Sequence, residues 1–113
     1  MAKAKDSENM ARAFRALAVE SRVRIMQLLA ERTLCVGALS NLLGISAGAI
    51  SQHLRVLRDA GLVDADRRGY FIHYRLARGA RARCRAALDI LFKPMKRGAR
   101  CAARKRSVRG RKT

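Results

Sequence analysis

The chain has 113 residues, half of them hydrophobic, and carries 26 Lys and Arg against 8 Asp and Glu, for a formal net charge of +18. This length suits one domain with a modest core and leaves little room for a second domain or a large substrate cleft. Three scattered cysteines exclude a disulfide scaffold, no apolar run reaches the ~20 residues of a membrane span, and residues 1–10 hold no apolar signal segment. We therefore expect a small cytoplasmic protein that binds no membrane and whose partner is anionic, above all a nucleic acid.

The positive charge is concentrated at the C-terminal end. Residues 93–113 contain 10 Lys and Arg and no acidic residue, which leaves a net charge of +8 for residues 1–92. Pro94 predicts the end of the last helix, and the basic residues beyond it have almost nothing apolar to bury. We expect a folded domain over 1–92 and a disordered basic tail over 93–113. The tail would be either an arm that holds DNA phosphates or a solvated charge run without a dedicated role.

Three amphipathic helices are predicted before residue 45. Apolar spacing indicates a first helix over 7–18 that Ser7 caps, a second from 20 or 21 to 31, and a third over 36–43 that Gly44 ends in a left-handed conformation. The residues that we expect to face the core from the second and third helices are Val23, Ile25, Met26, Leu29, Ala30, Leu39, Leu42 and Leu43.

The next segment is the most informative. Ser46 is a candidate N-cap, and residues 50, 54 and 57 are apolar and recur on one face of a helix that Gly61 ends. Because the opposite face is polar and basic, the short third helix, the tight turn and this helix predict a helix-turn-helix, whose second helix enters the major groove, ~12 Å wide. The residues expected to contact DNA here are Ser46, Gly48, Ser51, Gln52, His53, Arg55 and Arg58.

After Gly61 the hydrophobic period falls from 3.6 to about 2, which predicts a strand, a turn at Gly69 and a second strand. Such a hairpin is a wing, and its expected DNA contacts are Arg67 and Arg68. A final helix over 80–92 carries an apolar stripe that finds no partner inside so small a domain. A homodimer interface with the first helix explains this stripe best. The expected interface residues are Met10, Phe14, Leu17, Cys84, Leu88 and Leu91.

Four stretches of the chain together resemble the ArsR/SmtB family of bacterial winged-helix repressors, namely residues 14–25, 34–39, 51–63 and 74–76. The most specific is 51–63, which matches the family pattern Ser-x-His-Leu-x-x-Leu-x-x-Ala-Gly-Leu-Val. The resemblance implies a mainly α fold with a small β-hairpin, a winged helix-turn-helix in the order α-α-α-α-β-β-α. It also implies a homodimer that binds a palindromic operator in double-stranded DNA and represses an adjacent operon until a signal releases it. By motif match, the resemblance places Ser46, Ser51, Gln52 and His53 where the family's recognition helix meets DNA, and Arg67, Arg68 and Tyr70 in its wing.

One departure from the family concerns the start of the reading helix. Residues 47–49 are Ala, Gly and Ala, where members of the family commonly carry polar residues. Ser51, Gln52 and His53 would therefore carry more of the readout. Gln52 has the geometry to pair with adenine through two hydrogen bonds, which is worth ~1–3 kcal/mol of discrimination.

The cysteines leave the signal open. The family's arsenic sensors carry Cys-Val-Cys where this chain has Cys35 followed by Val and Gly, so a site of three thiolates for a thiophilic metal or metalloid would need Cys84 or Cys101. Redox sensing by Cys35 is another alternative, and the simplest is that Cys35 and Cys84 are small buried hydrophobic side chains. A zinc site on the last helix lacks ligands, because residues 80–92 hold one Asp and no His. No other cofactor is expected.

Two other classes of function compete with a regulator. We do not expect an enzyme, because the sequence has no Gly-rich phosphate loop, no Ser/His/Asp arrangement and no paired carboxylates. A nonspecific, chromatin-like nucleic-acid-binding protein would need only the charge of +18, and not an organised helix-turn-helix and wing. The leading prediction is a sequence-specific transcriptional regulator that joins the bacterial nucleoid when it is bound to DNA.

Overall fold

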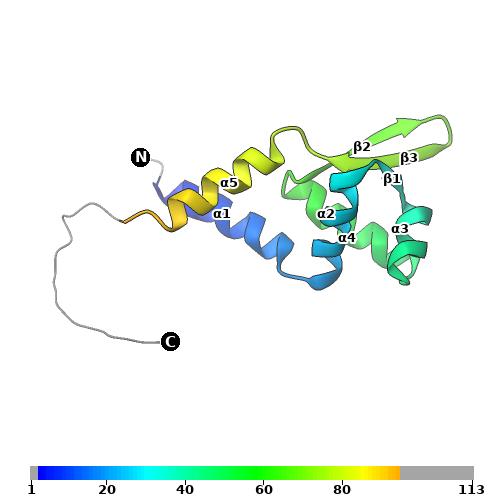
Figure 1. The fold of residues 1–113 in the computed structure, drawn as a ribbon, viewed down its shortest axis with the longest axis horizontal. Coiled ribbons are helices and arrows are strands. Elements are labelled where there is room, and N and C mark those ends of the chain that lie inside the picture. Colours follow the sequence, from blue (N-terminus) through cyan, green and yellow to red (C-terminus); the bar gives the residue numbers. More distant parts are fainter. Residues whose placement is uncertain (1–2, 95–113) are drawn as a thin grey trace.

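The computed structural model describes residues 3–94, with side chains described from residue 6. Residues 95–113, which hold Cys101 and almost all of the predicted tail, lie outside the described residues. The mainly helical fold and the predicted order of helices and hairpin are confirmed. The elements are α1 (Lys3–Leu17), α2 (Glu20–Glu31), β1 (Leu34–Cys35), α3 (Val36–Leu43), α4 (Ala47–Asp59), β2 (Val63–Arg68), β3 (Phe71–Leu76) and α5 (Ala80–Leu91). One small sheet lies at the end of the molecule where α2, α3 and α4 lie (Figure 1).

Capping residues set the ends of the helix-turn-helix. Gly44 follows α3 with φ of 73°, and its N–H donates to the carbonyl of Ser40 at 2.8 Å. Only a residue without a Cβ takes up such a conformation readily. Ser46 then caps α4, because its hydroxyl oxygen accepts from the N–H of Ala49 at 3.1 Å. Gly44 and Ser46 thus limit the turn between α3 and α4 to three residues, with Ile45 between them.

The first helix differs from its predicted bounds. α1 begins at Lys3, so Ser7 lies inside the helix and the prediction that Ser7 caps it is wrong. Lys and Ala are strong helix formers, and residues 3–5 are Lys, Ala and Lys. A serine followed by apolar periodicity indicates a helix start only where no helix former precedes it.

The sheet has one strand more than the predicted hairpin. β2 and β3 pair antiparallel from Val63 opposite Leu76 to Arg68 opposite Phe71. β1 pairs with the other edge of β3, with Cys35 opposite His73, so that the strand order is β1-β3-β2. A strand of two residues shows no hydrophobic period, and its partner lies far along the chain, so the sequence carried no signal for it.

The core lies between α2, α3, α4 and the start of β2. Val23 is 39% exposed and Leu42 is 46% exposed, and Ala30 is exposed too, so three of the expected core residues are wrong. The buried faces of the helices are narrower than predicted. Leu42, for example, lies about 100° around α3 from its buried neighbour Leu43, and at that angle its side chain is exposed. The core residues from Ile25 to Val63 are Ile25, Leu29, Leu34, Leu39, Leu43, Ile50, Leu54, Leu57, Leu62 and Val63.

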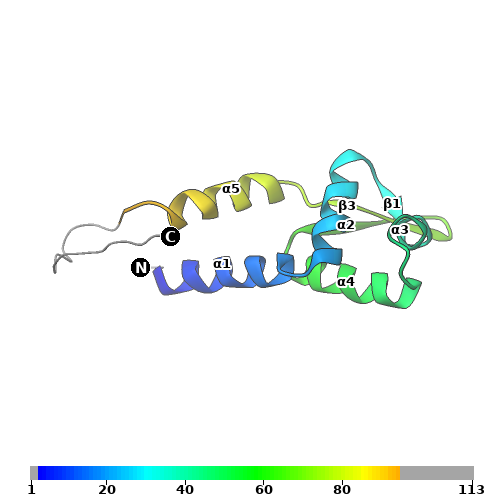
Figure 2. The same ribbon diagram turned by 60° about the horizontal axis from the view of Figure 1, so that its bottom comes forward.

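Helices α1 and α5 lie side by side and extend away from the end of the molecule that carries the hairpin (Figures 1 and 2). Each contributes one buried alanine to the core, Ala16 in α1 and Ala80 in α5, and half-buried Leu17 and Cys84 pack beside them. Arg83 adds a link, because its guanidinium donates to the carbonyl of Gly61 and, at 3.3 Å, to that of Arg78. None of the helices in the described part of the chain is long and apolar enough to cross a membrane.

Candidate DNA-binding surface

Helix α4 is held by one face and leaves the opposite face free. Its core side chains Ile50, Leu54 and Leu57 are buried, at no more than 1% exposure. Six of the seven residues predicted to contact DNA from this segment are exposed. They are Ser46, Gly48, Ser51, Gln52, Arg55 and Arg58.

The basic flank of α4 faces the sheet across an open groove of about 610 Å³. The groove is lined by Ser51, Arg55, Arg58 and Asp59 from α4 and by Tyr74 from β3. Arginine and hydroxyl groups in an open groove can donate hydrogen bonds to phosphates and to base edges. The groove thus places the basic flank of α4 beside β3 of the wing.

His53 occupies a different position from the one predicted. It is half-buried on the flank of α4 that faces α2, rather than on the free face. This burial lowers the pKa of His53 below its ordinary value of 6.5, and the positive charge of Arg22 on α2 lowers it further. His53 is therefore less accessible than the other residues predicted to contact DNA from α4, and its contact with DNA stays a prediction.

The lowered pKa of His53 predicts a pH dependence of stability. Between that pKa and 6.5 the unfolded chain binds more protons than the folded chain, so the free energy of unfolding increases as the pH rises through this window and falls as the pH drops. Urea unfolding at several pH values between about pH 5 and pH 8, the range in which histidine titrates, measures this dependence. The His53→Gln variant should lose much of the dependence, and His73→Gln, which retains His53, should keep it. An undiminished dependence in His53→Gln would contradict the assignment.

The wing has an exposed tip and two arginines, Arg67 and Arg68, whose surroundings differ. Tyr70 is 98% exposed next to Gly69, whose φ of 64° allows the tight turn. Side chains alternate along a strand, so Arg67 and Arg68 point to opposite faces of the sheet. Both are exposed, as predicted, but they lie in different electrostatic surroundings.

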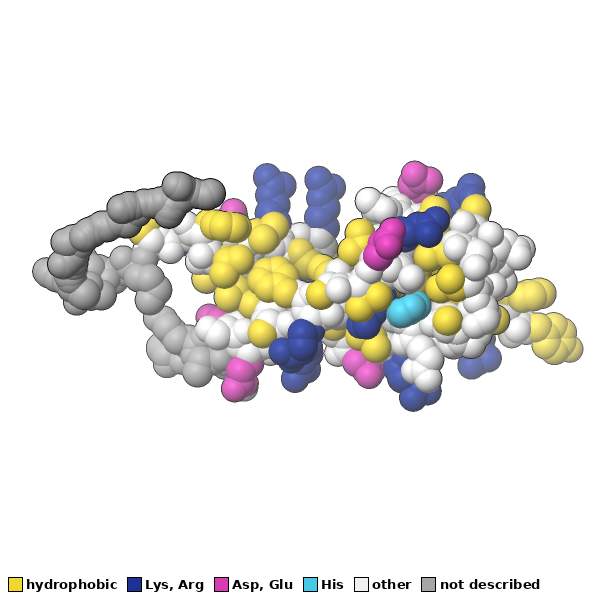
Figure 3. Space-filling view, turned by 90° about the horizontal axis from the view of Figure 1, so that it is seen from below, with side chains coloured by type: hydrophobic (Ala, Val, Ile, Leu, Met, Phe, Trp, Pro, Cys, Tyr) yellow, Lys and Arg dark blue, Asp and Glu magenta, His cyan; other side chains and the backbone are white. Residues whose placement is uncertain are grey.

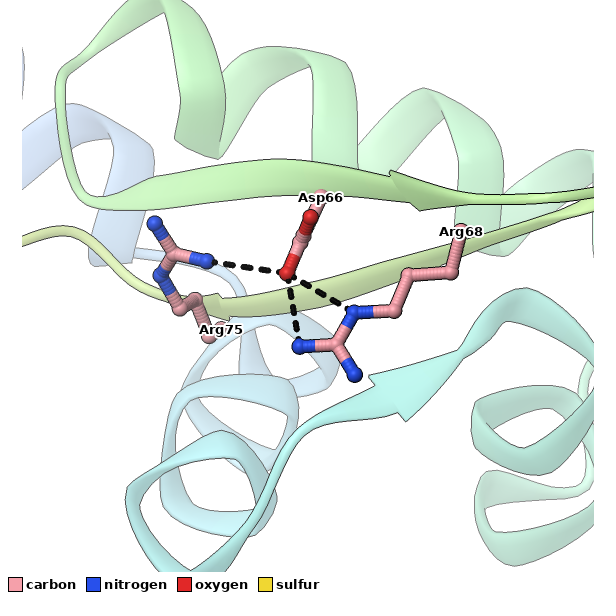
Figure 4. A network of polar contacts seen from close by, with 3 residues as sticks. All are labelled: Asp66, Arg68 and Arg75. Atoms are coloured by element: carbon pink, nitrogen blue, oxygen red, sulfur yellow. Dashed lines mark hydrogen bonds and ion pairs between the residues drawn. The ribbon is translucent and has the colours of Figure 1, made fainter.

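Asp66 holds Arg68 and also Arg75 (Figure 4). Nε and Nη2 of Arg68 donate to Oδ2 of Asp66 at 3.1 and 2.9 Å, and Nη1 of Arg75 donates to the same oxygen at 3.3 Å. Sequence reasoning missed Asp66, although the alternation of β2 places positions 66 and 68 on one face. The carboxylate partly neutralises two guanidinium groups that would otherwise be available to phosphate.

Removal of this carboxylate should increase nonspecific DNA binding. In Asp66→Asn both arginines are released to phosphate, and the slope of log K against log[salt] should steepen by about 1–2. Asp64→Asn is the matched control, because Asp64 lies on the same face of β2 and has the same charge, while the described residues show no ion pair for it. Fluorescence anisotropy on random-sequence DNA at several salt concentrations measures the slope. Equal slopes in the two variants would show that the Asp66 network does not restrain the arginines.

The predicted dimer residues lie on α1 and α5. Met10, Phe14, Leu17 and Cys84 are half-buried, while Leu88 is exposed at 46%. Figure 3 shows hydrophobic side chains gathered over the part of the molecule that α1 and α5 form. The apolar surface extends further than predicted, because three large side chains near the end of α5 are exposed and two of them were not expected. These are Ile90, Leu91 and Phe92, of which only Leu91 was expected.

The thiols lie on separate elements. Cys35 ends β1 and Cys84 lies in α5, and Figures 1 and 2 show these two elements apart. Both thiols are free and half-buried. Residues 6–94 contain no group of three or more His, Cys, Asp and Glu side chains that could hold a metal ion. Thiol sensing, with Cys101 outside the described residues, stays a prediction.

A free polar helix after a short turn, next to an antiparallel hairpin, defines a winged helix-turn-helix domain. The sequence model described as "Bacterial regulatory protein, arsR family" matches residues 20–65, which span α2 to the first part of β2. HlyU from Vibrio cholerae has the same fold, with a TM-score of 0.65 and 34% identity over 78% of this chain and 96% of that protein. A homodimeric winged helix-turn-helix DNA-binding domain from Mycobacterium bovis superposes with a TM-score of 0.68 and 34% identity, over 79% of this chain and 82% of that domain.

Curated relatives agree with this assignment. The transcriptional repressor SmtB homolog of Synechocystis sp. is 42% identical over 71 residues, 63% of this chain and 54% of the relative. The arsenical resistance operon repressor of Escherichia coli is 43% identical over 65 residues, 57% of this chain and 56% of the repressor. The matches thus span about half the length of these relatives. The chain belongs to the ArsR family of bacterial regulatory proteins.

Proposed function

We propose that this protein is a homodimeric repressor that acts in the cytoplasm, binds a palindromic operator next to its own operon and leaves it when a signal arrives. The observation that carries the proposal is the free polar and basic face of α4, held opposite a buried apolar face and beside the wing. A nonspecific DNA-binding protein needs positive charge but no such organised reading helix. The repressors named among its relatives support the same function.

In this proposal the place of each exposed side chain, on α4 or on the wing, decides which part of the DNA it contacts. Ser51, Gln52, Arg55 and Arg58 enter the major groove, where base edges display a distinct pattern for each base pair. Arg67, Arg68 and Tyr70 contact the minor groove and the phosphates next to it. His53 supports the helix from its flank, because it is half-buried beside Arg22. Sequence is thus read by α4, and the wing adds affinity and register.

The apolar face of α1 and α5 is the proposed homodimer interface. Two copies related by a two-fold axis place two α4 helices on successive turns of DNA, which requires a palindromic site. Large exposed apolar patches on small proteins are typical of interaction surfaces. The Mycobacterium bovis domain of the same fold is homodimeric, which supports the proposal.

A charge inside the interface should separate the protomers. Leu88→Asp is expected to give a monomer whose operator affinity is lower by roughly 10-fold or more, because the second reading helix is lost. Leu42→Asp is the control, since Leu42 in α3 has the same 46% exposure as Leu88. Sedimentation velocity measures the association state. A dimeric Leu88→Asp variant would place the interface elsewhere.

A footprint on the DNA that adjoins the gene tests the proposed function. With excess competitor DNA, and at physiological salt, we expect protection of one discrete inverted repeat. Uniform protection along the fragment would reject sequence-specific repression and would favour nonspecific, chromatin-like binding.

A further inference from the structure

We propose that a groove between α1, α2 and α4 is a binding site for a tetrahedral dianion, a phosphate or sulfate group. The groove is open and has a volume of about 430 Å³, which lies in the range of small-molecule sites, ~300–1,000 Å³. It adjoins the groove that faces Tyr74, and Asp59 lines both grooves. Its lining consists of Arg12, Arg15, Ala16, Arg22, Val56, Asp59 and Ala60.

The charges of the lining favour an anion. Three guanidinium groups come from two helices, and among the described lining residues only Asp59 is acidic. A guanidinium presents parallel N–H donors that match two oxygens of a phosphate or sulfate. The groove therefore carries a net positive charge and donors of the geometry that tetrahedral oxyanions accept.

Arg22 gives a second, independent indication. Its Nε is buried and has no hydrogen-bond partner among the described residues. A buried N–H donor without an acceptor costs free energy. An oxyanion that enters the groove beside Arg22 and displaces the atoms covering Nε would supply the acceptor. The positive field of Arg22 also reaches the imidazole next to it, where it contributes to the lowered pKa of His53. A bound dianion would oppose that field.

The groove stays open in the proposed dimer. Successive helical residues are about 100° apart, so Arg15 lies on the side of α1 away from Met10, Phe14 and Leu17. Arg12 lies at the edge of the apolar face, where its side chain lines a neighbouring pocket with Met10 and Phe14. The groove is thus free to take a phosphate from either of two sources, the DNA backbone that passes along α4 or a free phosphate ester.

NMR titration of the two histidines in the full chain tests the site. Sodium sulfate is added against sodium chloride at equal ionic strength, and the imidazole signals of His53 and His73 are followed with pH. We expect a saturable rise in the pKa of His53, with His73 as the internal reference that sulfate leaves unchanged. Sulfate does not itself titrate in this pH range, so the change reports binding near Arg22.

Variants separate the groove from a general salt effect. Arg22→Gln should abolish the saturable response of His53. The double variant Arg12→Gln and Arg15→Gln, which changes only exposed side chains, should weaken sulfate binding at least ten-fold and preserves the test if Arg22→Gln does not fold. Equal responses of His53 and His73, or an unchanged response in the double variant, would overturn the site.

The same titration on the DNA complex identifies the source of the phosphate. If a backbone phosphate fills the groove, saturating duplex DNA should abolish the response to sulfate, and the double variant should lose affinity equally for all DNA sequences. If the complex still responds to sulfate, a free phosphate group is the natural occupant. Both results support the site, and the arm without DNA does not depend on the proposed repressor function.

Discussion

Replacing Leu57 by alanine is expected to lower the free energy of unfolding by about 2–5 kcal/mol. Leu57 is fully buried on the core face of α4, where it packs in the cluster that includes Leu54 and Ile50. The substitution removes apolar contacts and leaves a cavity that the surrounding helices fill only in part. Since a small domain is stable by only ~5–15 kcal/mol, this loss is large. Urea unfolding followed by circular dichroism measures it.

Leu42→Ala provides the control for this prediction. The residue type and the change are the same, but Leu42 is 46% exposed on α3, so we expect a loss of less than about 1 kcal/mol. Both variants are compared with the parent at one protomer concentration, because dimer formation makes stability depend on concentration. A Leu57→Ala variant no less stable than Leu42→Ala would contradict the packing of α4 against the core.

Gln52→Ala is expected to lower affinity for the operator by about 1–3 kcal/mol, or roughly 5- to 150-fold, and to leave affinity for random DNA unchanged. Gln52 is exposed and lies two residues from buried Leu54, on the far side of α4 from the core. Its amide offers both a donor and an acceptor, as adenine requires in the major groove. Competition binding with operator and random duplexes separates the two affinities.

Gln27→Ala is the matched control, because Gln27 is also an exposed glutamine but lies on α2. It should bind the operator as the parent does. Equal losses of affinity on both DNA sequences in Gln52→Ala would show that Gln52 contacts phosphate rather than bases. No loss at all would assign the readout to other side chains of α4.

The elements with strong local signals were predictable from the sequence. α2, α3, α4 and α5 begin and end within about one residue of their predicted bounds, because Gly44, Ser46 and Gly61 fix the turns by backbone conformation and capping. The wing followed from its period of about 2. The exposed reading residues followed from the apolar stripe opposite them, since a helix that buries one face leaves the other free.

What escaped prediction depends on contacts between distant segments. β1 exists only because β3 offers an edge with which Cys35 and Leu34 can pair. Asp66 gained its role from Arg75, which is brought to it by the pairing of β2 and β3. The flank of α4 that His53 occupies is covered by α2, and a helical wheel does not show how far a neighbouring helix reaches around it. The hydrophobic pattern of the sequence predicts which face of a helix is buried. Packing against neighbouring elements decides how wide that buried face is.

Base readout in the major groove by Gln52 of α4 is the proposed basis of operator recognition. Its most direct test is a binding cycle with operator duplexes in which each adenine of the protected repeat is replaced in turn by 7-deazaadenine, which lacks the major-groove acceptor N7, or by 3-deazaadenine, which lacks the minor-groove acceptor N3. At one position in each half-site, 7-deazaadenine should weaken binding of the parent by roughly 5- to 150-fold and should have no further effect on Gln52→Ala. The corresponding 3-deazaadenine should leave parent binding unchanged. Losses from 7-deazaadenine that are equal in the parent and in Gln52→Ala at every position would contradict the account.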